Sequence, residues 1–397
     1  MSILPFPPSP ALALAPAPRP SVCVIGGGIA GCATAFFLTQ AGARVTLMER
    51  GSIGAHASGV NFGGVRRHAR AAAELPLALR AHRLWPLLRG LIGHDCDLET
   101  PGHLKLAFSP DEMAVLERWL PVGQAHGLEP RLLSPADLAK THPGLSPHIA
   151  GASFLAGDGF ANPRFVSPGL ARAARAAGAL VLENCPVIRL EKQGAGWLVH
   201  GPGDTRITAD IVVCATGAWT GPALDPWLEA LPITPAAPQM FVTEPVPVMN
   251  LPVLGVVSGD IYLRQSVRGN LIFGGGRGNI APDGLRSRPG DAAFARTPAL
   301  LARLLPGCAR VPVIRSWTGI EGHTPDGLPV IGPSSLHAGL FHARGFCGHG
   351  FQMGLGVGET LAELIVTGDT ALDLAAFRPD RFATPTSHPR PTAGAAP

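Results

Sequence analysis

Three glycines near the start of the chain have the spacing of a phosphate-binding turn. Gly26, Gly28 and Gly31 form a GxGxxG pattern between an apolar run at 22–26 and a run of small residues. In this pattern the first glycine permits a tight turn, the second lets a pyrophosphate approach the backbone, and the third allows a helix to pack closely on a strand. The N-terminus of that helix adds partial positive charge. The pattern therefore predicts a dinucleotide site.

An acidic residue at the expected distance strengthens this prediction. Glu49 follows a second apolar run at 44–48, where its carboxylate can accept hydrogen bonds from a ribose. It disfavours a 2′-phosphate and fits both NAD and FAD. Two later stretches favour FAD. Small residues at 212–220 ("VVCATGAWT") allow the backbone to pass a flat ring system, and a glycine-rich stretch at 346–364 precedes a late helix whose N-terminus can stabilise a reduced flavin.

These residues need strands and helices to hold them in place. The run at 22–26, the small-residue segment at 29–42 and the run at 44–48 predict a strand, a helix and a second strand, which together have the size of a βαβ unit. Helices are expected between 75 and 150, and a hairpin is expected around Arg268. The order of the elements predicts an α/β fold, with a Rossmann-like FAD-binding domain and a second α+β substrate domain built on an antiparallel sheet.

The two predicted domains alternate along the chain. The FAD-binding domain is assigned residues 21–90, 151–225 and 311–375, and the substrate domain residues 91–150 and 226–310. Proline- and alanine-rich segments predict a disordered N-terminal extension at 1–20 and a flexible C-terminal tail at 376–397. The flavin is expected between the two domains, where pockets for small ligands commonly lie.

The composition excludes several classes of protein. Hydrophobic residues make up 46% of the 397 residues and charged residues 15%, as in a compact globular protein. A net charge of +4 without basic runs interleaved with aromatics argues against nucleic-acid binding, and no apolar segment reaches membrane-spanning length. The seven cysteines lack a CxxC pair and the 14 histidines lack metal-binding spacing, so we expect neither an iron–sulfur cluster nor another metal in this chain. We expect a cytoplasmic protein, free or peripheral to the inner face of the membrane.

Five stretches in a fixed order resemble one family of flavoproteins. They are "VIGGGIAGCATAFFL", "ATGAW", "IYLRQSVRGNLIFGGG", "WTGIEGHTPDGLPVIG" and "GHGFQMGLGVGETLAEL". Over residues 20–375 the chain resembles the D-amino-acid oxidase (DAO) family of FAD-dependent oxidoreductases, in particular its glycine oxidase, sarcosine oxidase and amino-acid dehydrogenase branch. The stretch at 57–70 ("ASGVNFGGVRRHAR") is most similar to the β subunits of imino-acid and opine dehydrogenases.

The resemblance implies a reaction. In this family a hydride passes from the carbon that bears nitrogen to flavin N5, and the imine product hydrolyses. The expected substrate is an amino acid or secondary amine, such as an imino acid, an N-alkyl amino acid or an opine. The alternative is a flavin-bearing electron-transfer subunit of a heteromeric dehydrogenase, without activity of its own. An NAD-linked Rossmann dehydrogenase is disfavoured by the late "GHGFQ" motif.

Two positions bear on the flavin and on its reoxidation. Monomeric sarcosine oxidases attach FAD through a cysteine near the position of Gly319, so the resemblance implies non-covalent FAD here. They also carry a lysine that speeds the reaction with oxygen, near the position of the apolar Ile272. This difference favours a dehydrogenase over an oxidase. Its electron acceptor would be a quinone, an iron–sulfur subunit or another flavin subunit.

The resemblance also assigns residues to the cofactor. They come from the glycine turn, the end of the second strand, the loop after it, the strand end near 215 and the late glycine-rich loop. They are Gly26, Gly28, Ile29, Ala30, Gly31, Glu49, Arg50, Ala57, Ser58, Val187, Ala215, Thr216, Gly217, Trp219, Gly348, His349, Gly350, Phe351 and Gln352. His349 is also a candidate for the catalytic centre; the alternative is that it only packs its loop.

Two residues of one expected strand are candidates for substrate binding. Tyr262, the only tyrosine of the chain, falls where glycine oxidases place a tyrosine whose hydroxyl contacts the substrate carboxylate. Arg264 lies two residues further along and would share its face of the strand, where it could add charge to the same contact. The alternatives are an ordinary strand aromatic and an exposed strand arginine.

The arginines that clamp the carboxylate elsewhere in the family are replaced here. Glycine-type oxidases carry one at the position of Glu321 and a second at the position of Phe351 or Gln352. A buried carboxylate needs a cation or several donors. Arg66 and Arg67 are the candidates, and Arg67 is favoured because sarcosine oxidases use an arginine directly before "HA" in this loop. Glu321 could contact a substrate amine or a second cationic group, or form an ion pair with a nearby arginine.

Overall fold

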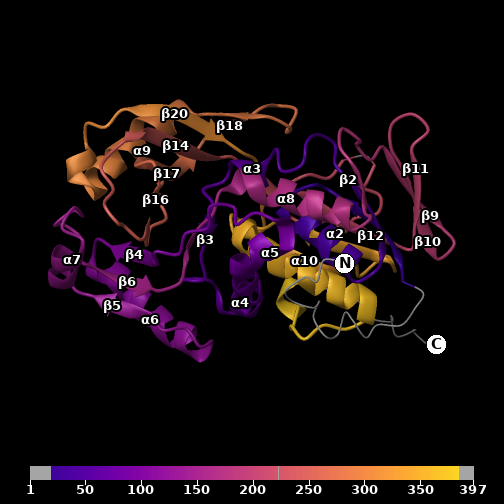
Figure 1. Cartoon of the computed structure of the whole chain (residues 1–397), viewed down its shortest axis with the longest axis horizontal. Helices are drawn as coiled ribbons and strands as arrows, with labels where there is room; N and C mark the ends of the chain where they lie inside the picture. Colours follow the sequence, from indigo (N-terminus) through magenta and orange to yellow (C-terminus); the bar gives the residue numbers. More distant parts are fainter. Residues whose placement is uncertain (1–18, 222, 384–397) are drawn as a thin grey trace, which may run out of the picture.

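The computed structural model describes residues 19–221 and 223–383. Two large sheets dominate it, and their elements occupy different sides of the molecule (Figure 1). The strands of an eight-stranded sheet lie at the left of the view, and a six-stranded sheet with its helices lies at the right. The predicted α/β class is confirmed by this arrangement.

The six-stranded sheet holds the predicted βαβ unit at its centre. In spatial order its strands are β22 (Val330–Pro333), β23 (Leu340–Arg344), β12 (Ile211–Gly217), β1 (Ser21–Ile25), β2 (Arg44–Met48) and β8 (Leu180–Leu182). All neighbours pair in parallel except β22 and β23. The central strands are buried, which explains why they read as continuous apolar runs.

Helices cover this sheet, and glycines allow three of them to approach closely. They are α2 (Ile29–Gln40), α3 (Ala57–Val60), α4 (Leu75–Leu84), α5 (Leu88–Ile92), α8 (Pro163–Ala176) and α10 (Gly350–Thr367). A Cβ added at Gly358 of α10 would lie 2.4 Å from Ala33 Cβ of α2, and one added at Gly356 would lie 2.8 Å from Ala81 N of α4. The later glycines of the "GHGFQMGLGVGET" stretch therefore serve helix packing.

The eight-stranded sheet is mostly antiparallel. Its order is β20 (Val313–Thr318), β14 (Pro238–Pro245), β17 (Asn270–Arg277), β16 (Tyr262–Gln265), β15 (Val253–Val256), β4 (His103–Ala107), β6 (Gly151–Leu155) and β5 (Arg131–Leu133). Helices α6 (Pro110–Ala125), α7 (Pro135–Thr141) and α9 (Asp291–Leu304) accompany it. The predicted hairpin is the antiparallel pair β16 and β17. Strands β6 and β20 lie at the start of two segments that were assigned above to the FAD-binding domain. The eight-stranded sheet therefore includes a few residues beyond the predicted boundaries at 150/151 and 310/311.

Smaller elements complete the chain. They are the three-stranded sheet β9 (Arg189–Gln193), β10 (Gly196–His200) and β11 (Arg206–Ala209), the pairs β3 (Gly64–Val65) with β7 (Gly159–Phe160), β13 (Thr234–Ala236) with β21 (Glu321–His323) and β18 (Asn279–Ile280) with β19 (Ser287–Arg288), and 3-10 turns at Ala72–Glu74, Trp85–Leu87, Pro306–Cys308, Ala375–Phe377 and Pro379–Phe382.

The two ends of the chain lie largely outside the described residues. The predictions of disorder at 1–18 and 384–397 therefore concern parts that the structure does not describe. Residues 376–383 differ from the predicted flexible tail, because two 3-10 turns form there and Phe377 is buried in the main core. Over residues 19–221 and 223–383, every helix is too short or too polar to span a bilayer.

Candidate active site

A cavity of about 880 Å³ opens where the two sheet regions meet. One part, the turn end, is lined by residues 25–30 and by the ends of β2 and β12. The other part, the sheet end, is lined by the segment 60–70 and by strands β4, β15 and β16 of the eight-stranded sheet. The volume lies in the usual range for ligand pockets.

The glycine turn joins β1 to α2 at the turn end. Gly26 has a positive φ of 111°, and a Cβ there would lie 2.4 Å from a backbone oxygen of β12. A Cβ at Gly31 would lie 1.9 Å from the carbonyl oxygen of Gly26. Helix α2 begins directly after Gly28, and the Ile29 N–H at its start donates to Ser58 Oγ at 2.9 Å. Residues 28–30 line the cavity, where the positive end of the helix favours a phosphate.

Glu49 is held at the end of β2 with its carboxylate toward the turn. Oε2 accepts a hydrogen bond from Gly27 N at 2.7 Å, and Oε1 accepts one from Gly51 N at 2.8 Å. The side chain is buried and lines the cavity. Because each carboxylate oxygen has a second lone pair, Glu49 can still accept hydrogen bonds from ribose hydroxyls.

A stack of three side chains borders the same end. The guanidinium of Arg50 lies 4.2 Å from the ring centroid of Trp219, and the ring of His56 packs on Trp219 at 4.8 Å. Trp219 Nε1 donates a hydrogen bond to Gly284 O at 2.8 Å, in the connection between β18 and β19. Burial lowers the pKa of both Arg50 and His56. The stack thus ties the end of β2 to the other half of the molecule.

Most residues predicted to contact FAD line this cavity. They are Gly26, Gly28, Ile29, Ala30, Glu49, Arg50, Ala57, Ser58, Val187, Ala215, Thr216, Gly217, Trp219, Gly348, His349, Gly350 and Phe351. Gly31 lies behind the turn, and Gln352 donates to Ala78 O at 2.8 Å within the helix packing. The positive-φ turn, the helix N-terminus and the fixed carboxylate fit a dinucleotide; the individual contacts remain predictions.

Two arginines of the segment after β3 enter the sheet end. Arg66 lines the cavity, and its Nη1 donates to His68 O. Arg70 is 3% exposed; its Nε donates to Arg66 O at 3.1 Å and its Nη2 to Gln352 Oε1 at 3.4 Å. Arg70 Nη1 is enclosed and has no hydrogen-bond partner among the residues that the structure describes. Burial, followed by the charge of Arg66, lowers the pKa of Arg70 to about 9.

One buried carboxylate offsets part of this positive charge. Glu74 Oε1 accepts a hydrogen bond from His349 Nδ1 at 2.7 Å and lies 3.9 Å from Arg70 Nη1. Burial opposes the ionisation of Glu74, but the hydrogen bond from His349 holds its pKa below the ordinary value. Burial, followed by the charge of Arg70, lowers the pKa of His349 to about 4. The His349 ring is therefore neutral at pH 7, with one nitrogen bound to Glu74.

The two other predicted arginines point away from the cavity. Arg67 Nε forms an ion pair with Asp158 Oδ1 at 2.9 Å, and Asp158 Oδ2 accepts from the backbone of Arg67 and His68. Arg264 Nε donates to Phe62 O at 2.9 Å, and its guanidinium lies 4.6 Å from the Phe160 ring centroid. Neither lines the cavity. Adjacent residues of an extended segment point to opposite sides, so Arg66 faces the cavity and Arg67 does not.

Tyr262 and Glu321 lie at the cavity wall together with His323. Tyr262 packs edge-on against Phe62, with ring centroids 5.0 Å apart. Glu321 Oε1 contacts His323 Nε2 at 2.8 Å, so its partner among the described residues is a histidine; an arginine was one of the alternatives. Burial, followed by the negative charge of Glu321, raises the pKa of Tyr262. Glu321 also lies close to Gly348, whose added Cβ would be 3.4 Å from Oε1.

Polar residues of β4 were not predicted at the site. His103 and Lys105 both line the cavity, and His103 Nδ1 contacts His68 Nδ1 at 3.0 Å. Burial lowers the pKa of His68 to about 3. The available signal was the alternation in "HLKLA", in which two polar residues alternate with Leu104 and Leu106 of the core. Arg70 had no comparable signal, because it lies in an irregular segment.

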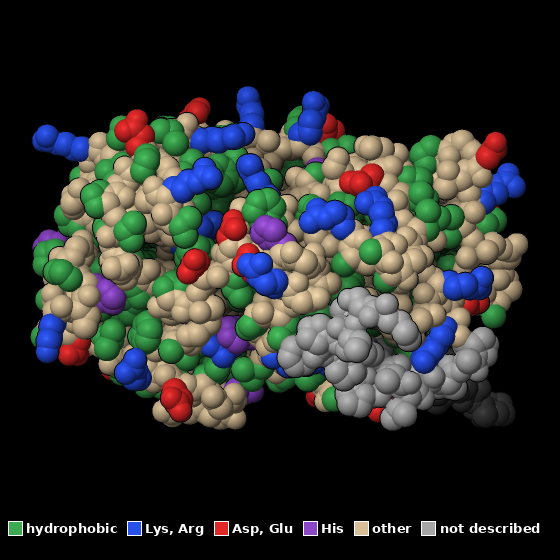
Figure 2. Space-filling view, in the orientation of Figure 1, with side chains coloured by type: hydrophobic (Ala, Val, Ile, Leu, Met, Phe, Trp, Pro, Cys, Tyr) green, Lys and Arg blue, Asp and Glu red, His purple; other side chains and the backbone are tan. Residues whose placement is uncertain are grey.

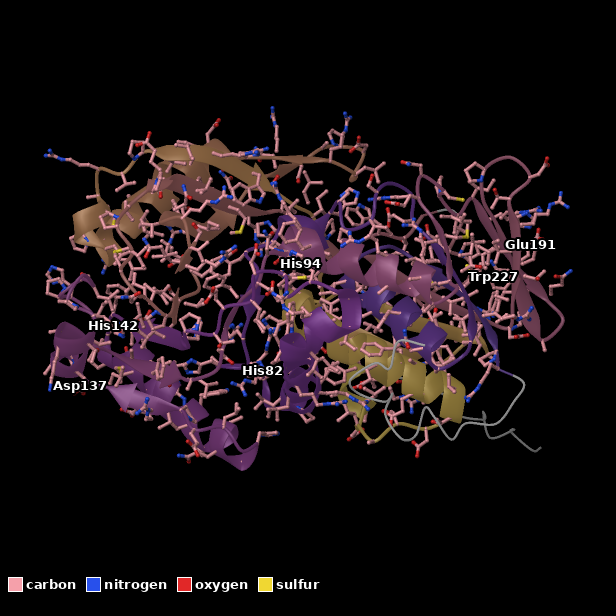
Figure 3. All side chains as sticks on the ribbon, viewed as in Figure 1. His82, His94, Asp137, His142, Glu191 and Trp227 are labelled. Atoms are coloured by element: carbon pink, nitrogen blue, oxygen red, sulfur yellow. The ribbon has the colours of Figure 1, made fainter. Side chains whose placement is uncertain are left out.

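Several conspicuous titratable residues lie far from the cavity. Figure 3 places Asp137 and His142 at one end of the molecule and Glu191 at the other. His94, Asp95 and Asp97 bring possible metal ligands within 4.8 Å of one another, but Asp95 is already paired with Arg89. On the face drawn in Figure 2, the Lys and Arg side chains of the described residues are scattered among acidic and apolar ones and form no continuous basic patch.

Comparisons with known proteins agree on one family. The family model described as "FAD dependent oxidoreductase" (DAO) matches residues 21–364. The glycine oxidase of Geobacillus kaustophilus is 29% identical over 382 residues, which cover 90% of this chain and 96% of that protein. The sarcosine oxidase subunit beta of Rhizobium meliloti is 28% identical over 91% of this chain and 88% of that protein.

The fold agrees as well. The crystal structure of L-proline dehydrogenase from P. horikoshii superposes with a TM-score of 0.84 at 28% identity, covering 92% of this chain and 98% of that one.

Proposed function

Because this chain belongs to the DAO family of FAD-dependent oxidoreductases, we propose that it oxidises the C–N bond of an amino acid whose carboxylate is bound by Arg66 and Arg70. FAD is its cofactor and supplies the acceptor for the hydride that leaves the carbon bearing nitrogen. The imine that results hydrolyses in water. The class of reaction is that of the family; the identity of the anchoring residues is the proposal.

The carboxylate site rests on one observation, which is the enclosed guanidinium of Arg70. Within residues 19–221 and 223–383 its Nη1 lacks a hydrogen-bond partner, and Arg66 beside it adds a second charge. An unsatisfied buried donor costs about 1–3 kcal/mol, and more when the group is charged. A substrate carboxylate at the sheet end would remove that cost by accepting from both guanidinium groups. The two residues would therefore replace the arginines that are absent at Glu321 and at Phe351 or Gln352.

The other residues of the sheet end would orient and enclose the substrate. Tyr262 and Phe62 form an aromatic wall, which excludes water from one side of the cavity. Glu74 holds His349 by its Nδ1, which fixes the ring at the start of α10. A substrate held by its carboxylate and by this wall keeps one C–H bond in a constant direction, and such positioning can supply much of the rate.

Glu321 supports a substrate larger than glycine. Its carboxylate gives the cavity a negative wall beside the positive one, and its present partner is His323. A cationic or amine-bearing group on the substrate would be attracted there. This favours a basic amino acid or an N-substituted one of the opine type over a small neutral amino acid.

Further aspects of the proposal concern the flavin and the electron acceptor. We propose non-covalent FAD, because Gly319 stands near the position of the attaching cysteine and has no side chain that could bond to a flavin. Similarity to a sarcosine oxidase subunit beta supports assembly with other subunits, which would receive the electrons. A quinone is the alternative acceptor.

A subunit without its own activity is not favoured, because the glycine turn for the cofactor and the two arginines for the substrate line one cavity of one chain.

An anaerobic absorbance titration of the purified chain tests this function. The panel contains D-, L-, N-methyl and cyclic amino acids and opines, and matching amines without the carboxylate. We expect an amino acid to bleach the flavin and its decarboxylated analogue to bind far more weakly. Admission of air then separates an oxidase, which recolours quickly, from a dehydrogenase. Equal reduction by the acid and the plain amine would contradict the carboxylate site.

A further inference from the structure

One row of directly paired residues crosses the eight-stranded sheet beneath the cavity. In spatial order it consists of Ser153 of β6, Lys105 of β4, Gly255 of β15, Tyr262 of β16, Gly274 of β17 and Met240 of β14. Directly paired residues project from the same face of a sheet. Lys105 and Tyr262 therefore face the cavity on either side of Gly255, and all three residues line it.

The ring of Tyr262 and the end of Met240 fill the space above Gly274, whereas the cavity reaches the sheet at Gly255. A Cβ added at Gly274 would lie 2.4 Å from Tyr262 Cε2, so the tyrosine ring leans away from Gly255 and over Gly274. A Cβ added at Gly255 would lie 3.9 Å from Lys105 Cδ and 3.3 Å from His103 Nε2. The nitrogen of Lys105 is two bonds beyond Cδ. Because Gly255 and Lys105 both line the cavity, a ligand in the cavity can lie beside the end of the lysine side chain.

Lys105 has an unusual environment for a lysine. Within the described part of the chain, its Nζ makes no hydrogen bond or ion pair. The charged and titratable groups that face it are Arg66 after β3, His68, His103 on its own strand and Glu112 of α6. Burial, followed by the charge of Arg66, lowers the pKa of Lys105 to about 8, against the opposing effect of Glu112. An appreciable fraction of Lys105 is therefore an uncharged amine near neutral pH.

The substrate of the proposed function needs such a group. An amino acid reaches the site with a protonated nitrogen, which has no lone pair to assist departure of the hydride from the neighbouring carbon. The nitrogen is only two bonds from the carboxylate carbon. A group that takes its proton must therefore neighbour the residues that hold the carboxylate, and Lys105 neighbours Arg66.

We propose that Lys105 accepts the proton of the substrate ammonium before the C–H bond breaks, an inference that rests on the proposed function. The N–H bond of the ammonium breaks and its electron pair stays on the substrate nitrogen. A new N–H bond forms with the lone pair of Lys105, so one positive charge moves from substrate to lysine. The amine lone pair then assists hydride departure, and Lys105 returns its proton to water after the product leaves.

The kinetic test compares Lys105→Met and Lys105→Arg with the wild type. Anaerobic stopped-flow reduction by the amino acid identified in the titration, with L-arginine and octopine as first probes, gives the second-order rate constant of reduction between pH 6 and 10. We expect the wild-type value to rise as pH rises through about 8 and then level off. In both variants we expect the rise near pH 8 to disappear. Their rate constant at pH 7 should be about 10²-fold lower than that of the wild type, because a general base usually contributes at least this factor.

The arginine variant separates proton transfer from mere positive charge. Arginine keeps the charge but cannot accept a proton in this pH range. If Lys105→Arg kept the wild-type profile while Lys105→Met lost it, the lysine would act only as a cation and the proposal would be overturned. A rise of the rate constant near pH 8 that persists in both variants would overturn the proposal as well. Flavin content and thermal unfolding of each variant confirm that the holoenzyme is intact.

A second readout does not depend on turnover. The chain has only three lysines, Lys105, Lys140 and Lys192, so ¹³C-dimethylation of the holoenzyme gives few signals, and Lys105→Arg identifies the one from Lys105. We expect that signal to titrate near pH 8. Titration near the ordinary lysine value of about 10.4 would overturn the proposal even if the enzyme is active. If no amino acid reduces the wild type, the proposed function fails instead, and the lysine signal still reports whether the amine is neutral.

Discussion

The two ends of the cavity are built in different ways. At the turn end, the cavity is bordered mainly by backbone, and glycines are required because an added Cβ at Gly26 or Gly31 would collide with a neighbouring carbonyl oxygen. At the sheet end, charged side chains arrive from separate parts of the chain, among them Arg70, Lys105 and Glu321. The turn end is formed by neighbouring residues and does not tolerate an added side chain. The sheet end depends on which side chains project into the cavity from strands and loops that are distant in sequence.

This difference explains how one family keeps its cofactor while its substrates vary. Removing a side chain at the sheet end leaves the glycine turn intact, so flavin content and substrate affinity should respond to different mutations. The arginine missing at Glu321 is an example, because cations on another segment, Arg66 and Arg70, occupy the sheet end of the same cavity. Substitutions at each end of the cavity test whether the two ends are separable.

The largest effect is expected at the glycine turn. Gly31→Val places a Cβ within 1.9 Å of Gly26 O, a contact that the backbone cannot relieve without moving α2 from β1. We expect a colourless protein that has lost FAD, measured as the ratio of flavin to protein absorbance. Gly144→Val is the matched control, since no atom of the described residues lies within 4 Å of its added Cβ and the yellow colour should remain. A yellow Gly31→Val protein would contradict the assigned turn.

Substitution of Arg70 should affect the sheet end alone. Arg70→Met removes one partner of the proposed buried pair with the substrate carboxylate. Truncation of such a partner costs about 2–5 kcal/mol of binding free energy, so we expect the substrate concentration for half-reduction to rise about 100-fold. FAD content should stay at the wild-type level. Arg70→Lys keeps a charge but loses the planar fork, and its affinity should fall between the two. Parallel loss of FAD would show that the two ends are coupled.

Arg67 provides the contrast to Arg70. Because Arg67 pairs with the buried Asp158 and does not line the cavity, Arg67→Met should lower the free energy of unfolding by about 3 kcal/mol. Substrate affinity of the folded fraction should change less than about threefold, which corresponds to under 1 kcal/mol. Urea unfolding and flavin reduction measure the two quantities. An affinity loss as large as that of Arg70→Met would restore Arg67 as the carboxylate ligand.

The smallest effect is expected at the negative wall. Glu321→Gln removes a partly exposed charge whose partner is His323, and we expect about tenfold weaker reduction by substrates with a second cationic group. Neutral amino acids should be affected little. The ratio of the two affinities is the measurement, with the wild type as reference. An unchanged ratio would remove Glu321 from substrate selection.

Local features of the site could be predicted from the sequence. The glycine turn, Glu49 and the hairpin that carries Tyr262 each follow from residues close together in the chain. The family motif favours Arg67 over Arg66, but such a motif specifies a position only to within about one residue. In an extended segment a shift of one residue reverses the direction of the side chain, and here Arg66 lines the cavity.

Other parts could not be predicted, because no local pattern marks them. Lys105 lies on a strand that pairs in parallel with β15, about 150 positions further along the chain. Its separation from Tyr262 by one glycine exists only in the folded sheet. The strands β6 and β20 likewise joined the eight-stranded sheet through pairing partners that composition does not reveal.

The sequence by itself determined that this protein holds a dinucleotide, that the dinucleotide is FAD, and that its fold is an α/β one with a second sheet. Those features depend on steric requirements of glycine and on short-range periodicity, which are written in neighbouring residues. Only the tertiary structure decided which cationic side chains line the cavity and which, like Arg67, pair with a carboxylate elsewhere. Strand register and side-chain direction are set by pairing between distant segments, so the arrangement of Arg66, Arg70, Lys105 and Tyr262 arises only when both sheets have formed.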